Sequence, residues 1–335
     1  MTHLSNLPRS PMSRRGFLRI TAIAGGMTLA GCALAPALRD RAVTAHSATR
    51  TLMGTRIHLT LVGPDAGAAQ NAIETTFDAM ARLVDVFDHR QPASALARLN
   101  RDGQLATAPA ELLDVLQRAL DYGALTNGAF DVTVKPLLDA RRDGIPATPS
   151  LRARVDYRQI RIGGGGVWMG IPGAEVTLDG IAKGRVIDGG LEALRQLGYV
   201  NALVEAGGDL RTAGARADGA PWQVGITHPR HADQGDILSV LSLLTRAVAT
   251  SGDYMNAFTA DFSEHHIIDP RTGSSPLELA SATVLAATAL DADALSTTMM
   301  VLGAEAGLAL AERLDGVEAV LVTKDLRVLK TRGLA

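Results

Sequence analysis

The stretch that most constrains the fold is residues 280–303, where an apolar run leads directly into a segment with acidic and hydroxyl side chains. The run 281–288 is short and rich in small and β-branched residues, which predicts one buried strand. Asp293 and Thr297 stand four residues apart, so a helix there places both on one face. Such a pair offers hard oxygen ligands suited to Mg²⁺. The alternative interpretation is that Asp291 caps the helix and the Thr297 hydroxyl bonds back to the backbone.

The first forty residues are a different kind of sequence and are left out of the fold. Arg14 and Arg15 stand shortly before the apolar run 20–30, an order that resembles a twin-arginine export signal. The run is too short, and too interrupted by glycine, to make a good membrane-spanning helix. We therefore expect a signal peptide over residues 1–32, followed by a tether over residues 33–48.

The end of that signal resembles a lipoprotein processing box. Residues 29–32 read Leu-Ala-Gly-Cys, and Cys32 is the only cysteine of the chain, so it has no internal disulfide partner. Acylation of Cys32 would hold the protein on the periplasmic side of a bacterial inner membrane, or in an outer membrane. The alternative is a chance cysteine in an ordinary signal peptide; export is expected in both cases.

Length and composition limit the fold and the class of ligand. A chain of 335 residues can bury a sizeable core, and a net charge of −2 gives no reason to expect nucleic-acid binding. Strand-like runs come in clusters followed by helices, without a regular βαβ repeat. This order predicts an α+β fold with mixed or antiparallel sheets and helices packed on one side. We treat residues 49–335 as one functional unit.

The turn at residues 179–184 has the setting of a phosphate site. It reads Asp-Gly-Ile-Ala-Lys-Gly, follows a strand-like run over residues 176–178 and opens a predicted helix over residues 185–197. Backbone N–H groups at the start of a helix can hold a phosphate, and Lys183 adds a movable positive charge beside them. The spacing is not that of a P-loop, and a plain tight turn with an exposed lysine is the alternative.

Two adjacent histidines, His265 and His266, lie in a polar stretch between apolar runs. Neighbouring side chains of a strand point to opposite faces, so at most one of the two is expected to face a given cleft. A zinc site is not expected, because no cysteine or third histidine stands at ligand spacing.

Taken in order, the motifs resemble the ApbE family, the FAD:protein FMN transferases. The resemblance extends over nearly all of the mature chain, and the ordered set is far more specific than any one motif. The motifs are residues 53–55 (Met-Gly-Thr), 94–100, 128–136, 180–184, 207–209 (Gly-Gly-Asp), 251–254, 266–273 and 293–297. The resemblance implies a T-fold-like α+β architecture with FAD in a cleft between two interleaved lobes.

The resemblance also implies an activity. The enzyme would split FAD, transfer the FMN half to a serine or threonine hydroxyl of an exported flavoprotein, such as a subunit of a membrane redox complex, and release AMP. Mg²⁺ would be held by an oxygen from the Gly180 region together with Asp293 and Thr297. Lys183 would lie near the phosphates.

Further residues take their expected roles from the same resemblance. His266, directly before Ile-Ile-Asp-Pro, would be the general base toward the acceptor hydroxyl, because an imidazole can accept a proton near neutral pH. His265 would then be its outward-facing neighbour. The residues that fall where family members contact FAD are Met53, Ala129, Phe130, Asp131 and Ile267.

Two positions depart from the family pattern. Family members often carry a tyrosine that can stack on FAD four residues before the serine equivalent to Ser94, and this chain has Arg90 there. A guanidinium can also stack on a flat ring. Many members have Leu-Gly-Gly-Ile-Ala-Lys where this chain has Asp179 in place of the first glycine. Its negative charge would oppose a pyrophosphate unless it approaches a metal or a ribose hydroxyl, and the sequence leaves that choice open.

Two other functions compete with transfer. An FAD pyrophosphatase that gives FMN and AMP would use the same residues with water as the acceptor. A lipid-tethered protein that binds a flavin without chemistry would explain the signal and Cys32, but it leaves the polar motifs around Asp293 and His266 without a purpose.

Overall fold

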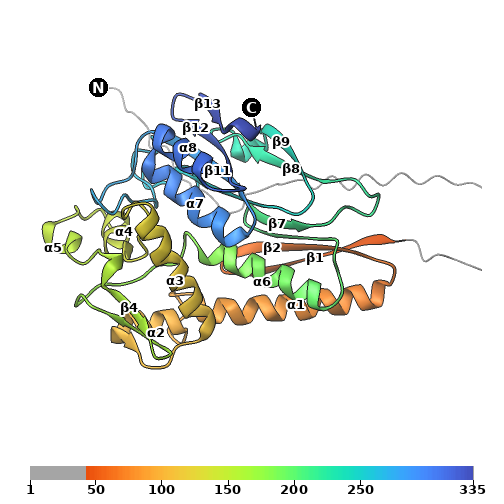
Figure 1. The fold of residues 1–335 in the computed structure, drawn as a ribbon. Coiled ribbons are helices and arrows are strands. Elements are labelled where there is room, and N and C mark those ends of the chain that lie inside the picture. The colour runs from red at the N-terminus through yellow and green to blue at the C-terminus, as the bar shows by residue number, and fades with distance from the viewer. Residues whose placement is uncertain (1–42, 335) are drawn as a thin grey trace, which may run out of the picture.

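The computed structural model describes residues 43–334, so the predicted signal peptide, Cys32 and most of the predicted tether lie outside the described residues. Within the described part of the chain, no helix is long and apolar enough to cross a bilayer. The described residues form two lobes that are interleaved in the sequence (Figure 1).

The larger lobe is built on an eight-stranded sheet in which every neighbouring pair of strands is antiparallel. In spatial order its strands are β1 (Thr44–Leu52), β2 (Thr55–Gly63), β6 (Ala202–Ala206), β7 (Asp209–Ala213), β10 (Ala247–Gly252), β11 (Leu279–Ala286), β12 (Glu318–Thr323) and β13 (Val328–Lys330). Together with the helices beside it, this sheet confirms the predicted α+β class.

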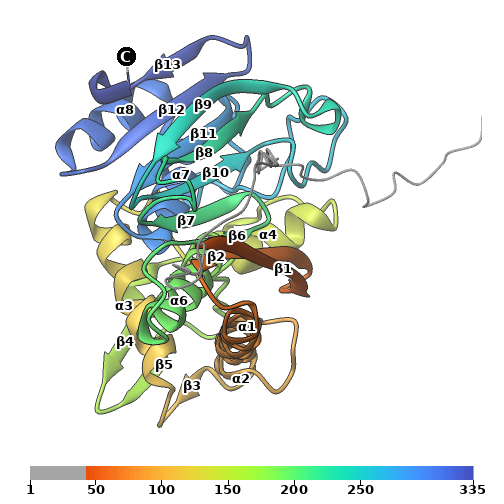
Figure 2. The ribbon, with the colours of Figure 1, turned by 90° about the vertical axis from the view of Figure 1, so that its right-hand side faces the viewer.

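Helices cover one face of the large sheet and a β-hairpin covers part of the other (Figure 2). The helices are α1 (Ala66–Phe87), α6 (Ala182–Gln196), α7 (Ala289–Leu302) and α8 (Ala304–Arg313), and the hairpin is β8 (Trp222–Thr227) with β9 (Ile237–Leu243). Alternate residues of one strand face the two layers. In β10, Ala247 and Ala249 join the helical core, whereas Val248 packs against the hairpin. Strand β11 is buried on both faces, which explains its unbroken apolar run.

The smaller lobe is inserted between α1 and α6. Its elements are α2 (Ala95–Asp102), β3 (Gln104–Leu105), α3 (Ala110–Leu125), α4 (Lys135–Arg142), α5 (Pro149–Arg152), β4 (Ile160–Gly163) and β5 (Gly166–Met169). The three strands form a second sheet in the order β3-β5-β4. Short 3₁₀ helices, Tyr157–Gln159, Ala232–Gln234 and Arg332–Leu334, complete the secondary structure.

The structure corrects several predicted boundaries. Strand β1 begins at Thr44, inside the predicted tether, and pairs along its whole length with β2. Its side chains are exposed or half-buried, so this edge strand lacks the apolar signal that marks a buried one. The run 176–178 is not a strand, since the stretch has one isolated bridge, Val134↔Glu175, and no ladder of strand pairing. Residues 138–156, whose Arg, Asp and Pro content is typical of a surface loop, carry most of α4 and all of α5.

Candidate active site

The centre of the site is the place where the first turns of α6 and α7 meet. A β-carbon on Gly184 would lie 2.2 Å from the carbonyl oxygen of Ala289, so only glycine lets the two helices approach this closely. The Gly184 N–H donates to Oδ2 of Asp293 across the junction at 3.0 Å. The side chain of Thr288 accepts from the Asp291 N–H and caps α7.

The three predicted magnesium ligands come together at this junction. A β-carbon on Gly180 would lie 2.9 Å from Oγ1 of Thr297, so the turn before α6 passes directly over the Thr297 hydroxyl. Asp293 lies one turn earlier on the same helix and is 3 % exposed. The Ser251 hydroxyl lies 3.1 Å from Oγ1 of Thr297 and 2.9 Å from Oγ of Ser296.

The alternative interpretation of this helix does not hold. Thr288, not Asp291, provides the cap. Asp291 instead accepts hydrogen bonds from Arg118 and from the Tyr122 hydroxyl, on α3. Thr297 Oγ1 contacts Ser251, so it is not reserved for the helix backbone.

The charge around Asp293 suits a cation. Burial raises the pKa of its carboxyl group to about 7, and the nearby Asp209 carboxylate acts in the same direction, against the opposing effects of Lys183 and the Gly184 N–H. No group of three or more His, Cys, Asp or Glu residues placed to hold a metal occurs in residues 43–334. A site here would therefore rely on one carboxylate, one hydroxyl and backbone oxygen, a hard donor set that fits Mg²⁺ with several waters retained.

Lys183 forms an ion pair with one buried carboxylate, and a second one, Asp293, acts on its pKa. Its Nζ atom is 2.7 Å from Oδ2 of Asp209, whose other oxygen accepts the Thr250 N–H at 3.0 Å. Burial alone lowers the pKa of Lys183, but Asp209 and Asp293 more than offset this, so its pKa is raised above the usual value. The sequence singled out the motif at residues 207–209 without assigning Asp209 this partner, because nothing in the spacing connects the two motifs.

The two histidines are arranged differently from the prediction. His265 is fully buried, with Nε2 3.1 Å from the carbonyl oxygen of Pro276 and Nδ1 accepting the Ile267 N–H at 3.3 Å. The expectation that His265 faces outward was therefore wrong. It assumed strand alternation, and this segment is a loop with isolated bridges.

His266 has properties that suit a general base. Its ring is half-buried, and its shielded Nδ1 has no hydrogen-bond partner among the described residues. Burial, helped by the adjacent His265 ring, lowers the pKa of His266 to about 4. The Asp179 carboxylate raises its pKa and the Lys183 ammonium group lowers it, so both charges of the turn at residues 179–184 act on His266.

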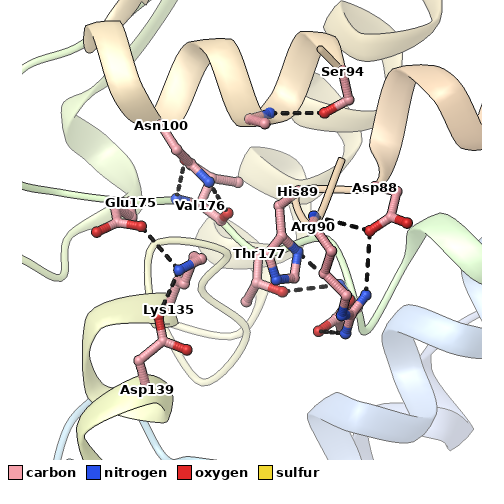
Figure 3. A network of polar contacts seen from close by, with 12 residues as sticks. Asp88, His89, Arg90, Ser94, Asn100, Lys135, Asp139, Glu175, Val176 and Thr177 are labelled. Atoms are coloured by element: carbon pink, nitrogen blue, oxygen red, sulfur yellow. Dashed lines mark hydrogen bonds and ion pairs between the residues drawn. The ribbon is translucent and has the colours of Figure 1, made fainter. Parts of the chain in front are cut away.

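The two departures from the family pattern are bonded to each other. Arg90, in the loop after α1, donates from Nη2 to Oδ2 of Asp179 at 3.1 Å. Its backbone N–H donates to Asp88 (Figure 3). His89 also faces this carboxylate, with Nδ1 4.0 Å from Oδ1 of Asp179. The Arg90 guanidinium thus balances the negative charge that Asp179 adds beside the turn, whereas burial lowers the pKa of His89 and leaves its imidazole neutral at neutral pH.

Further contacts hold the segment that leads into the turn (Figure 3). The Asn100 side chain makes two hydrogen bonds with the backbone of Val176, at 2.7 and 2.8 Å. Lys135 pairs with both Glu175 and Asp139. This segment lacks a β-ladder, so side chains from α2 and α4 take over the task of fixing it.

The remaining predicted FAD contacts are mostly buried. Ala129, Phe130 and Ile267 are each at most 5 % exposed, and Met53 occupies the β1–β2 turn with a positive φ of 52°. Asp131 accepts from the N–H groups of Thr133 and Tyr157, at 2.8 and 2.9 Å, and from the Thr133 hydroxyl. Its carboxylate therefore organises this turn, and a direct contact with FAD stays a prediction.

Comparisons with known proteins agree with this geometry. The profile of the ApbE family matches residues 53–321. The sequence is 33 % identical over 309 residues to an FAD:protein FMN transferase of Vibrio cholerae, covering 88 % of this chain and 90 % of that protein. It is 30 % identical over 337 residues to the protein of the same name from Salmonella typhimurium, covering 94 % and 95 %.

Solved structures show the same likeness. The flavin transferase ApbE from Vibrio cholerae superposes with a TM-score of 0.75 at 28 % identity, covering 87 % of this chain and 98 % of that one. The ApbE protein from Thermotoga maritima gives a TM-score of 0.78 at 25 % identity, with the same coverage.

Proposed function

The chain belongs to the ApbE family, and we propose that it is an FAD:protein FMN transferase that moves FMN from FAD to a serine or threonine hydroxyl and releases AMP. The observation that carries the proposal is the meeting of α6 and α7. It brings Lys183, Asp293 and Thr297 beside the Gly180 turn, and the charges of Asp179 and Lys183 also act on the pKa of His266.

The reaction is phosphoryl transfer to a weak nucleophile. The acceptor oxygen forms a bond to the phosphorus of the FMN half, the bond from that phosphorus to the bridging oxygen breaks, and AMP leaves with that oxygen. Neutral His266 takes the proton of the acceptor hydroxyl. Its lowered pKa keeps the imidazole unprotonated at neutral pH, as a base must be.

The pyrophosphate needs positive charge around it. Asp293, Thr297 and a Gly180 oxygen would hold Mg²⁺, which when bound neutralises charge on the phosphate oxygens. Lys183 presents its ammonium group at the start of α6, where the N–H groups of the first turn also favour an anion. Asp209 keeps that ammonium group in place before the substrate binds.

The main competitor is hydrolysis by the same residues, with water in place of the acceptor hydroxyl. The names of the relatives support transfer to a protein, and the acceptor is expected to be an exported flavoprotein. An export signal and an acylated Cys32 would place the enzyme beside such an acceptor, on the periplasmic side of the inner membrane. A binding protein without catalysis gives no reason for a His266 Nδ1 that lacks a hydrogen-bond partner among the described residues, or for a buried Asp293 carboxylate.

Mass spectrometry tests the proposal directly. The purified protein is incubated with FAD, Mg²⁺ and a domain that carries a candidate acceptor threonine. We expect the acceptor to gain the mass of one FMN while AMP is released, and both changes to be lost in Asp293→Ala. Release of FMN and AMP in the presence of several unmodified acceptors would favour the hydrolase, and FAD that stays intact would contradict both.

A further inference from the structure

A second buried ion-pair cluster lies outside the groups that the reaction uses. Arg230, in the connection between β8 and β9, donates from Nη1 and Nη2 to the two carboxylate oxygens of Asp253 at 2.7 and 2.8 Å. Asp253 is fully buried and Arg230 is 19 % exposed. A two-pronged pair of this kind fixes direction as well as distance.

The same guanidinium makes a second contact farther along the chain. Its central carbon lies 4.4 Å from the centroid of the Phe262 ring, a cation–π geometry. Phe262 has a positive φ of 59°, which non-glycine residues seldom adopt, so tertiary contacts must hold it there. Arg230 therefore contacts the residues at both ends of the segment 253–262.

Lys324, in the β12–β13 turn, supports the same two points. Its Nζ atom donates to the carbonyl oxygen of Phe262 at 2.6 Å and lies 3.5 Å from Oδ2 of Asp253. The β8–β9 and β12–β13 hairpins lie side by side in both views (Figures 1 and 2). Two hairpins that are far apart in sequence thus converge on one loop.

The loop that begins at Asp253 leads directly to His266. The His266 N–H donates to the carbonyl oxygen of Asn256 at 3.0 Å, three residues after Asp253. On the other side, Phe258 and Thr259 donate to the carbonyl oxygen of Glu264, which closes the loop back on itself just before the histidines. No regular strand or helix fixes residues 253–266. His265 is held by Ser275 and Pro276, and the chain that approaches His266 from the other side depends on the ends of this loop.

We propose that Arg230 and Lys324 are positioning residues for His266. Their contacts with Asp253 and Phe262, here called the clamp, hold the segment 253–262 and so fix His266 relative to the turn at residues 179–184. The proposal rests on the proposed function for its kinetic consequence only. The geometric part, that the clamp fixes His266, can be measured without any transfer reaction.

The test uses Arg230→Gln, Arg230→Lys and Lys324→Met, with Arg327→Gln as the matched control. Arg327 lies in the same turn as Lys324, but its side chain pairs with Asp325 at the surface, 70 % exposed. The first readout is the rate at which diethyl pyrocarbonate modifies His266, followed by mass spectrometry with His58, on strand β2 outside this loop, as the internal reference. The second is the pair kcat and KM for FAD in FMN transfer.

We expect Arg230→Gln and Lys324→Met to speed the modification of His266 about tenfold, because a loosened loop opens more often. We expect kcat to fall about 10- to 100-fold, because an ångström-scale displacement of a reacting group costs that much. The KM for FAD should change less than threefold, Arg230→Lys should recover part of kcat, and Arg327→Gln should match wild type.

The contrary results are equally specific. Normal modification of His266 in both Arg230→Gln and Lys324→Met overturns the clamp, whatever the assay shows. A rise in KM for FAD with kcat unchanged would assign Arg230 to FAD binding and also overturns it. If Arg230→Gln does not fold, Lys324→Met decides by the same readouts, since it leaves the Arg230–Asp253 pair in place. A wild-type protein that transfers no FMN refutes the proposed function and leaves the modification result standing.

Discussion

The two halves of the active site are held in different ways. The phosphate half is built where α6 and α7 meet, and its geometry comes from helix starts and from Gly184, which allows backbone to touch backbone. The histidine half is an irregular loop, which Arg230 and Lys324 from two distant hairpins hold through ion pairs with Asp253. The first arrangement fixes groups against a densely packed core, whereas the second depends on a few charged side chains. Mutations in the two halves should therefore differ in whether they change folding stability, kcat or KM.

The largest effect is expected at the phosphate half. Asp293→Ala removes the only carboxylate among the predicted magnesium ligands, so FMN transfer should fall by about 10³-fold or more at saturating FAD. AMP release, followed by chromatography, gives the rate. Asp291→Asn is the control, because Asp291 pairs with Arg118 and Tyr122 on α3. Asp291→Asn should lower the melting temperature with little change in kcat. An equal loss of kcat in both variants would contradict the proposed role of Asp293 as a magnesium ligand.

The histidine half should show the next largest effect. His266→Gln removes the base, and transfer should fall by about 10²- to 10⁴-fold. In wild type, only the unprotonated imidazole is active, so kcat/KM should decline as pH falls toward the His266 pKa of about 4. The variant should lack this acid limb, which is expected between about pH 5 and pH 3. A limb with that midpoint that persists in His266→Gln would mean that another group is the base, whereas protonation of Asp293, with a pKa of about 7, would give a separate decline at higher pH in both proteins.

Gly184 tests whether the phosphate half depends on close packing. In Gly184→Ala the new methyl group would meet the Ala289 carbonyl oxygen at 2.2 Å, so α6 and α7 must separate. We expect a loss of about 1–3 kcal/mol in the free energy of unfolding, measured by denaturant titration, together with weaker activity. The control is Gly163→Ala, at a hairpin position with nothing within 4 Å of the added β-carbon and no positive φ. Equal stability of the two variants would mean that the helix contact tolerates a methyl group.

The same contrast explains what the sequence could predict. Helices α1 and α3 carry local signals in the sequence, because apolar periodicity and end signals such as the Asp65 cap depend on neighbouring residues alone. Asp293 and Thr297 share a face because four residues span one helical turn. The Arg230–Asp253 pair and the contact of Lys183 with Asp209 join segments whose approach depends on the whole sheet. The direction of His265 was mispredicted because an irregular loop has no period.

The smallest effect is expected at the rim, where Arg90 and Asp179 meet. Both side chains are largely exposed, at 62 % and 41 %, so their mutual attraction should contribute less than about 1 kcal/mol. If the pair shapes the FAD site, Arg90→Gln should raise the KM for FAD severalfold with kcat unchanged. Asp179→Asn should act less, because it also removes a negative charge beside the pyrophosphate.

A double-mutant cycle sharpens this last expectation. When the two residues act through their pair, Arg90→Gln should cost less in an Asp179→Asn background than in wild type, and the difference should shrink at high salt. Additive changes in KM would mean that Arg90 meets FAD independently of Asp179. Either result is confined to KM, so a drop in kcat in these variants would show that the rim also positions the reacting groups.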